Sequence, residues 1–263
     1  MRAGPRWPRG CGARDPEVEL AGASDVTVVI PAKDEAKTIA PLVRRCRELA
    51  AEVIVVDGHS TDATAEEARA AGAKVIQDNR RGKGEALRCA IPHVTTEIVV
   101  FIDADGSHDP EDIPKLVEPI RRGEADHVTG SRLLGGSSEL HGGFDEFFRL
   151  AGSSFVTACI NRRFKVRLSD SQNGFRALRT AVLRSLTLKE DSTTTEQEMT
   201  IKTLRAGYRM AEVPAHEHAR IHGTSHISVS KAAFRYLYSL AKYLLVPGSA
   251  IAFALLGPGG VAA

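Results

Sequence analysis

Short apolar runs alternate with longer amphipathic stretches along most of the chain. The first run, 26–31 (VTVVIP), is rich in β-branched residues, and the stretch 36–50 that follows places apolar residues three and four positions apart, from Ile39 to Leu49. The first pattern is typical of a buried strand, and the second is typical of a helix with one face on a core. Residues 26–50 are therefore predicted to form a strand followed by a helix.

The same alternation continues over the next hundred residues. Further strands are predicted at 52–58, 73–77, 97–103 and 126–132, and further helices at 61–71, 84–93 and 110–122. Such alternation predicts an α/β fold with a central, mostly parallel sheet flanked by helices on both faces. Ligands of these folds bind at the carboxyl ends of the strands.

Composition and charge narrow the class of protein. The 263 residues are 43% hydrophobic with a formal net charge of +2, which suits one large domain with a sizeable core. This near-neutral balance provides no overall attraction for nucleic acid, so no nucleic-acid partner is expected. The four cysteines are far apart and form no CxxC pair, which argues against a zinc site or a disulfide framework and fits a reducing compartment.

Polar residues follow several of the predicted strands directly. Asp57, Asp103, Asp105 and Arg132 all come at strand ends and should meet at one edge of the sheet. Asp103 and Asp105 alternate with Ala104, so both carboxylates would point the same way in an extended segment. Two such carboxylates can hold one hard divalent cation, either Mg²⁺ or Mn²⁺.

The stretch 82–87 (GKGEAL) precedes a predicted helix and has two interpretations. Lys83 between two glycines could help to hold a phosphate at the helix N-terminus. The GxxxxGK[ST] spacing of a phosphate-binding loop is absent, so an ordinary glycine turn at the start of a helix is equally consistent with the sequence.

Several motifs taken together indicate a family. In order and spacing, VTVVIPAKDEAKTI, EVIVVDGHSTDAT, RGKGEAL, FIDADGSHDPEDIP, HVTGSR, NGFRAL and EVPAHEHARIHGTSH resemble the family 2 glycosyltransferases of GT-A fold. The chain is most similar to the dolichol-phosphate mannosyltransferase-like branch, over about residues 26 to 226. The resemblance implies inverting transfer of a sugar from a nucleotide-diphosphate sugar to a polyprenyl phosphate, such as dolichyl or undecaprenyl phosphate.

The resemblance also implies roles for individual residues. The nucleotide would be bordered by Pro31, Lys33, Glu35 and Asp57, and the metal would be held by Asp103 and Asp105. The acceptor phosphate would be held by Arg132, with Arg149 as a second arginine, and the donor diphosphate would be contacted by Arg220. Ala104, Arg176 and His226 complete the expected substrate contacts, and the catalytic residues would be Asp105, Arg132 and Asp170.

The sequence departs from the family pattern at three places. Gly58 and His59 replace the second Asp and the Gly of a VVDDGS motif, Ser107 stands where a Gln often assists the metal, and His226 replaces a Lys. These departures leave open a nucleotide-sugar-binding protein without transfer activity. A sugar transferase with a soluble hydroxyl acceptor is also open. Such an acceptor would need a carboxylate base, for which the candidates are Asp170, Glu196 and Glu198.

The two ends of the chain differ from the central part. Residues 1–24 are rich in Arg, Gly and Pro and are expected to be a flexible tail before a catalytic domain at 25–226. Residues 227–263 are expected to form an amphipathic helix and an apolar tail too short to span a bilayer. We expect a cytoplasmic protein bound peripherally to the cytoplasmic membrane face. A helix that docks on the catalytic domain or forms an oligomer contact is the alternative.

Overall fold

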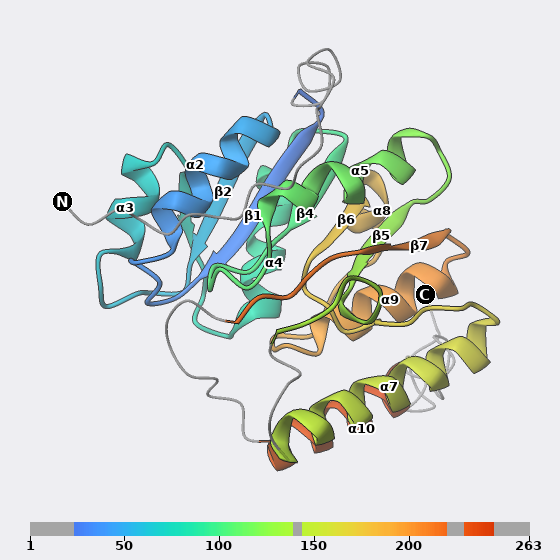
Figure 1. The fold of residues 1–263 in the computed structure, drawn as a ribbon. Coiled ribbons are helices and arrows are strands. Elements are labelled where there is room, and N and C mark those ends of the chain that lie inside the picture. Colours follow the sequence, from blue (N-terminus) through green and yellow to red (C-terminus); the bar gives the residue numbers. More distant parts are fainter. Residues whose placement is uncertain (1–23, 139–143, 220–228, 245–263) are drawn as a thin grey trace, which may run out of the picture.

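The computed structural model describes residues 24–138, 144–219 and 229–244, and these form a sheet with helices on both faces (Figure 1). The strands are β1 (Val26–Ala32), β2 (Glu52–Asp57), β3 (Lys74–Gln77), β4 (Ile98–Phe101), β5 (His127–Ser131), β6 (Arg176–Arg179) and β7 (Met210–Pro214). Their order in the sheet is β3-β2-β1-β4-β6-β5-β7. All pairings are parallel except those of β6, which runs antiparallel to both β4 and β5.

The helices follow the strands closely. They are α2 (Ile39–Leu49), α3 (Thr64–Ala70), α4 (Lys83–Ala90), α5 (Ile113–Arg121), α6 (Arg132–Gly135), α7 (Phe144–Phe164), α8 (Thr180–Ser185), α9 (Thr195–Arg205) and α10 (Val229–Leu244). Two short 3₁₀ helices, η1 (Ile91–His93) and η2 (Pro110–Asp112), flank β4. Pro92 and Pro110 suit the first turns of these short helices because proline has no backbone N–H to donate there.

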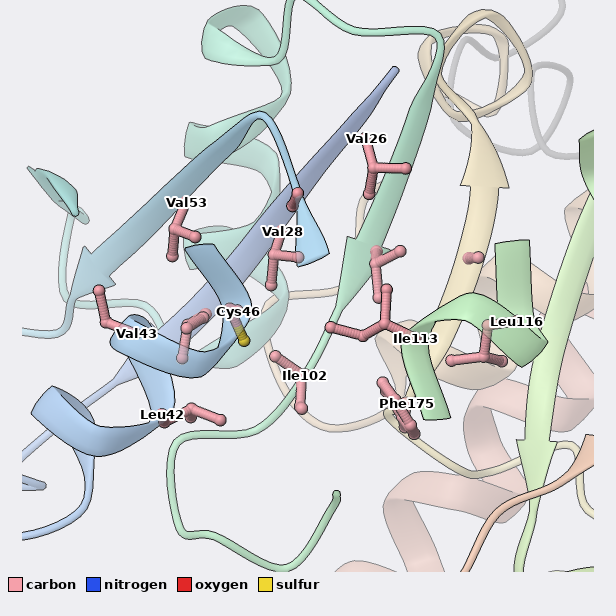
Figure 2. Close-up of a cluster of buried hydrophobic side chains, with 14 of the residues drawn as sticks. Val26, Val28, Leu42, Val43, Cys46, Val53, Ile102, Ile113, Leu116 and Phe175 are labelled. Atoms are coloured by element: carbon pink, nitrogen blue, oxygen red, sulfur yellow. The ribbon is translucent and has the colours of Figure 1, made fainter. Parts of the chain in front are cut away.

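The side chains of the central strands alternate between two cores, one on each face of the sheet. Val28 and Ile30 of β1 pack with α2, α3 and α5, whereas Val29 packs with α4, α8 and α9 on the opposite face. Figure 2 shows the first core, in which Cys46 of α2 and Leu116 of α5 lie over the strands. This double burial explains why the strands are continuous apolar runs.

The predicted α/β class and the mostly parallel sheet are confirmed, and the five predicted strands are present. The sequence patterns did not indicate β6 and β7. β6 is only four residues long and begins with a charged residue, Arg176, so it lacks the expected apolar run. The expected extension of β4 through Asp103 is also corrected: the strand ends at Phe101, and Ala104 and Asp105 lie in a turn.

Helices α7 and α10 lie side by side at the end of the molecule where the parallel strands terminate, and α9 supports them (Figure 1). Ile160, Leu240 and Tyr243 are buried between these helices. Their outer surface keeps four large hydrophobic side chains in solvent, namely Phe155 (55% exposed), Phe234 (72%), Leu237 (50%) and Tyr238 (63%). None of the helices described is both long and apolar enough to span a membrane.

Candidate active site

A pocket of about 590 Å³ lies at the carboxyl ends of β1, β2 and β3 and reaches the end of β4. Its lining residues come from strand ends and from the turns that follow them: Pro31, Ala32, Lys33, Val56, Gly58, His59, Thr61, Asp78, Arg80, Arg81, Gly82, Lys83, Ala86 and Asp103. The position agrees with the rule that open parallel sheets bind ligands at their carboxyl edge. Four of its side chains are basic, so the pocket suits an anionic ligand.

Of the residues expected to border a nucleotide, some line the pocket and others support the turns around it. Pro31 and Lys33 line the pocket, whereas Asp57 is buried at the end of β2, where its Oδ1 accepts the backbone N–H of Ser60 at 3.2 Å. The backbone N–H of Glu35 donates to Thr64 Oγ1 at 2.8 Å, which ties the turn after β1 to the start of α3. Asp57 and Glu35 therefore order the turns that form the pocket.

Lys83 links the pocket to the acidic end of β4. Its Nζ lies 2.6 Å from Asp103 Oδ1 and 2.8 Å from Glu196 Oε1 of α9. Burial would lower the pKa of Lys83, but the charges of Asp103 and Glu196 and their hydrogen bonds outweigh it and raise this pKa. A Cβ on Gly174 would come within 2.7 Å of Lys83 Nζ and 2.8 Å of Asp103 Oδ2, so a larger residue there would shift this ion pair.

Asp105 and Ala104 are buried in the turn after β4. Asp105 Oδ1 accepts the backbone N–H of Ser107 at 3.1 Å. His108 is stacked on Phe175 with 5.2 Å between ring centroids, and its buried Nδ1 has no hydrogen-bond partner. Burial lowers the pKa of His108, which the nearby carboxylates of Asp103, Glu217 and Asp105 oppose.

These donors fit a divalent cation that binds together with a phosphorylated ligand. Asp103 and Asp105 supply carboxylate oxygens, and the unpartnered Nδ1 of His108 lies among the same acidic groups. Within the described ranges, no group of three His, Cys, Asp or Glu side chains forms a ready metal cage. Mg²⁺ commonly binds through one or two carboxylates and substrate phosphates, so two aspartates are sufficient on the protein side.

Arg132 follows β5 and lies in a nearly buried cluster of charges. Its Nε and Nη2 donate to Asp170 at 2.6 and 3.0 Å, and its Nη1 donates to Glu217 at 3.5 Å. Burial alone would lower the pKa of Arg132, but Asp170 and Glu217 raise it. Conversely, burial would raise the pKa of Asp170, yet the hydrogen bonds and charge of Arg132 lower it.

Asp170 is therefore ionised and paired at neutral pH. Glu212 of β7 also holds its backbone N–H through a 2.7 Å hydrogen bond. A carboxylate paired in this way orients Arg132, and its engagement makes it a weak candidate for removing a proton from a hydroxyl. The pairing favours a positioning role for Asp170, and the expected catalytic role stays a prediction.

Arg176, an expected substrate contact, is held by hydrogen bonds within the protein. Its side chain is fully buried at the start of β6, and its guanidinium donates to Asn173 O and Glu196 O at 3.0 Å each. Nη1 also donates to Thr200 Oγ1 and Nη2 donates to Ser171 O, so all three guanidinium nitrogens are engaged. Burial lowers the pKa of Arg176. The group joins the β6 turn to α9, and its expected substrate contact stays a prediction.

Three other expected substrate contacts lie wholly or partly outside the described residues. Arg149 lies in α7, but its side chain is outside the described part of the structure. Arg220 and His226 both lie outside the described residues. Their expected roles at the donor diphosphate and the acceptor remain predictions.

The sequence motifs did not single out Asp78 and Arg80 as site residues, and His59 entered only as a departure from a family pattern. All three line the pocket after β2 and β3. The basic run Arg80-Arg81 next to Gly82 was an available signal, because glycine and cations before a helix suit an anion. Contacts between these turns could not be inferred from spacing.

Comparison with known proteins assigns the family. The model for glycosyl transferase family 2 matches residues 27–187. The chain belongs to glycosyl transferase family 2. It is 30% identical over 201 residues to the glycosyltransferase AglJ of Haloferax volcanii, with 76% of this chain and 65% of AglJ covered. It is also 32% identical over 197 residues to a dolichyl-phosphate hexose transferase of the same organism, covering 72% and 81%.

Solved structures agree with this assignment. The glucosyl-3-phosphoglycerate synthase of Mycobacterium tuberculosis, in complex with Mn²⁺, UDP-glucose and phosphoglyceric acid, matches with a TM-score of 0.70 and 27% identity, covering 92% of this chain and 88% of that one. A complex of the same enzyme with Mg²⁺ and UDP matches with a TM-score of 0.69. The predictions of a GT-A glycosyltransferase that uses a nucleotide sugar and a divalent cation are confirmed by these matches.

Proposed function

We propose that this family 2 glycosyltransferase transfers a sugar, with inversion, from a nucleotide-diphosphate sugar to a polyprenyl phosphate. The exposed apolar face of α7 and α10, at the carboxyl end of the sheet, is the observation that carries this choice of acceptor. A lipid-linked acceptor lies in a bilayer, and an apolar helix face lets the protein reach it from the surface. The 32% identical dolichyl-phosphate hexose transferase supports the same class.

The donor half of the reaction would use the pocket at β1 to β4. The nucleotide would lie over Pro31 and Lys33, with its diphosphate toward Asp103 and Lys83. A divalent cation held by Asp103 and Asp105 would neutralise charge on the diphosphate as the nucleoside diphosphate leaves. Lys83 is already within 2.6 Å of Asp103, so a fixed ammonium group would be present beside the same charge.

In the acceptor half of the reaction, the phosphate would need to be held in position and would not need a general base. A phosphate monoester is ionised near neutral pH, so its oxygen can form the new bond to the anomeric carbon while the bond to the diphosphate breaks. Arg132 would hold this phosphate. Asp170 and Glu217 engage three of the five guanidinium N–H groups, which leaves two that the described residues do not use.

A peripheral position on the cytoplasmic membrane face is part of this proposal. Arg162, Arg163, Lys165 and Arg167 are exposed at and after the end of α7, with no acidic residue among them. Cations beside an exposed apolar face favour an anionic lipid surface.

Mass spectrometry of products tests the acceptor class. The protein would be incubated with Mn²⁺ or Mg²⁺, a panel of UDP- and GDP-sugars, and either a short polyprenyl phosphate or 3-phosphoglycerate. The proposal predicts a glycosyl polyprenyl phosphate from one donor and no glycosylated phosphoglycerate. Glycosylated phosphoglycerate without any lipid product would contradict the proposal.

A soluble hydroxyl acceptor is the second candidate, and the structural match to glucosyl-3-phosphoglycerate synthase favours it. A hydroxyl nucleophile would require a general base. Asp170 is engaged by Arg132, Glu196 by Lys83 and Glu198 by Lys202, so all three expected bases are already in ion pairs. Glu198 is fully buried and accepts the backbone N–H groups of Lys189 and Glu190. This arrangement supports the phosphate acceptor over the hydroxyl.

A further inference from the structure

The donor pocket has two chemically different ends. Asp103 at the end of β4 marks the end for the metal and the diphosphate, and the pocket extends from there past β1 to the turns after β2 and β3. A nucleotide with its diphosphate at Asp103 would place its base toward those turns. The side chains at this far end are His59, after β2, and Asp78 and Arg80, after β3.

Two of these residues have backbone conformations that side chains other than glycine rarely adopt. His59 has φ +58° and Arg80 has φ +62°. Left-handed conformations are unfavourable for residues with a Cβ, and they cluster at functional sites where surrounding structure holds them. The turn after β2 therefore keeps a histidine where a glycine would fit more easily.

Hydrogen bonds fix the orientation and tautomer of the His59 ring. Arg80 Nη2 lies 3.2 Å from His59 Nδ1, and a guanidinium can only donate, so Nδ1 must accept. His59 Nε2 lies 2.8 Å from Asp78 O and therefore carries the proton and donates. Asp78 also anchors Arg80, because its Oδ1 accepts the backbone N–H of Arg80 at 2.8 Å. The three residues form one unit, the His59–Asp78–Arg80 unit.

This unit presents donors to the pocket. Arg80 is exposed and lines the pocket, and one of its five N–H groups is used by His59. The neighbouring Gly58 contributes no side chain, and Asp57 is buried and engaged by Ser60. The carboxylate of Asp62 in the same turn accepts from the backbone N–H groups of Ala36 and Thr64, whereas the exposed guanidinium of Arg80 has N–H groups that can donate to a base oxygen.

We propose that Arg80 is a specificity-determining contact for a nucleobase with a carbonyl oxygen, and that His59 is the positioning residue that holds Arg80 toward it. This inference rests on the proposed donor site and adds a recognition rule to it. Uracil and guanine both offer a carbonyl acceptor, whereas adenine offers none. The guanidinium of Arg80, held in place by His59, selects UDP-sugars or GDP-sugars over ADP-sugars.

Calorimetric binding tests this inference without turnover. UDP, GDP, ADP and inorganic pyrophosphate would be titrated into the full chain with Mn²⁺ present. Pyrophosphate has no base, so it reports the diphosphate end alone. The wild type should bind UDP or GDP at least tenfold more tightly than ADP, and the separate titrations show which of the two keto bases is preferred.

Three substitutions separate recognition from structure. Arg80→Ala and His59→Gly should each weaken binding of the preferred nucleotide about tenfold, the loss of one charge-assisted hydrogen bond, and leave pyrophosphate binding unchanged. Glycine suits φ +58°, so His59→Gly should fold normally. His59→Asn should restore part of the affinity, because asparagine tolerates this conformation and can accept from Arg80. Arg69→Ala, exposed on α3, is the matched control.

Several results would overturn the inference. Equal affinity of the wild type for ADP and for both keto nucleotides would remove the selectivity. Equal weakening of pyrophosphate and nucleotide by Arg80→Ala would show a general effect on the pocket, and unchanged nucleotide binding would show no contact. If the wild type bound neither nucleotide nor pyrophosphate with Mn²⁺, the proposed donor site itself would fail, and this inference with it.

Discussion

At the residue scale, ion pairs between distant parts of the chain hold the site in place. Lys83 is paired with Asp103 and Glu196, and Arg132 is paired with Asp170. Each pair joins side chains from different elements at the carboxyl edge of the sheet. Removing one partner of a buried pair leaves the other charge without compensation, which typically costs about 3–5 kcal/mol.

Asp170→Asn should lower the free energy of unfolding at neutral pH. It should also reduce how much this free energy falls when the solution is acidified. Burial would raise the pKa of Asp170, but Arg132 lowers it below the ordinary value of 3.8. The ionised Asp170 therefore contributes its full stabilisation at pH values above 3.8, and this stabilisation is lost as pH falls through the lower pKa of the folded state. We expect the variant to lose about 3 kcal/mol of unfolding free energy at neutral pH. Urea unfolding at a series of pH values measures both effects.

The exposed Glu66→Gln of α3 controls for the general loss of a carboxylate. An Asp170→Asn variant with the same stability as Glu66→Gln at neutral pH would contradict the importance of the Arg132 pair.

At the element scale, α10 is attached to the loop before α9 through Glu190. Lys242 Nζ and Tyr243 Oη both donate to Glu190 Oε1, at 2.7 and 2.9 Å, and Thr194 donates to Oε2 at 2.6 Å. Burial would raise the pKa of Glu190, but these hydrogen bonds and the charge of Lys242 lower it. The same loop contacts the start of α4, because Gly84 N donates to Asp191 O at 3.0 Å.

Glu190→Gln should therefore loosen α10 more than the rest of the fold. The amide loses the ion pair with Lys242 but keeps a similar shape, so we expect faster amide hydrogen exchange in α10 and little change in β1 and β2. Hydrogen-exchange mass spectrometry measures this. If amide exchange in α10 were equally fast in the wild type and in Glu190→Gln, Glu190 would not be what holds this helix.

The exposed face of α7 and α10 should bind lipid. The double substitution Phe234→Ser and Leu237→Ser removes two of its four large apolar side chains, so sedimentation with vesicles containing anionic lipid should fall several-fold. Ala70→Ser, exposed on α3, is the control. Undiminished vesicle binding by the double variant would contradict this membrane surface.

Sequence patterns predicted the elements better than the contacts between them. β1 and α2 were predicted because their apolar periodicity reflects burial on a sheet or a helix face. β6 was missed because its place between β4 and β5 depends on pairing with strands more than forty residues away along the chain. Likewise, Asp170 and Arg132 are 38 residues apart, so their ion pair could not be read from local spacing.

At the scale of the whole molecule, helices α7 and α10 lie toward the end where the parallel strands terminate (Figure 1). The residues that line the donor pocket come from the same carboxyl ends of the strands. The sheet supports the pocket, and α9 connects the two regions, since Glu196 at its start pairs with Lys83 while its later residues pack against α7 and α10. Under the proposed function, the donor would bind at Lys83 and Asp103, and the acceptor would approach along α7 and α10.

The measurement that tests the central claim most directly is the initial rate of sugar transfer as a function of Mn²⁺ concentration, for the wild type, Asp105→Ala and the surface control Glu66→Ala. A metal held by Asp103 and Asp105 predicts that wild-type and control rates saturate with Mn²⁺ and vanish with EDTA, while Asp105→Ala loses metal-dependent turnover and keeps its fold. Full turnover in EDTA, or full turnover by Asp105→Ala, would contradict the account.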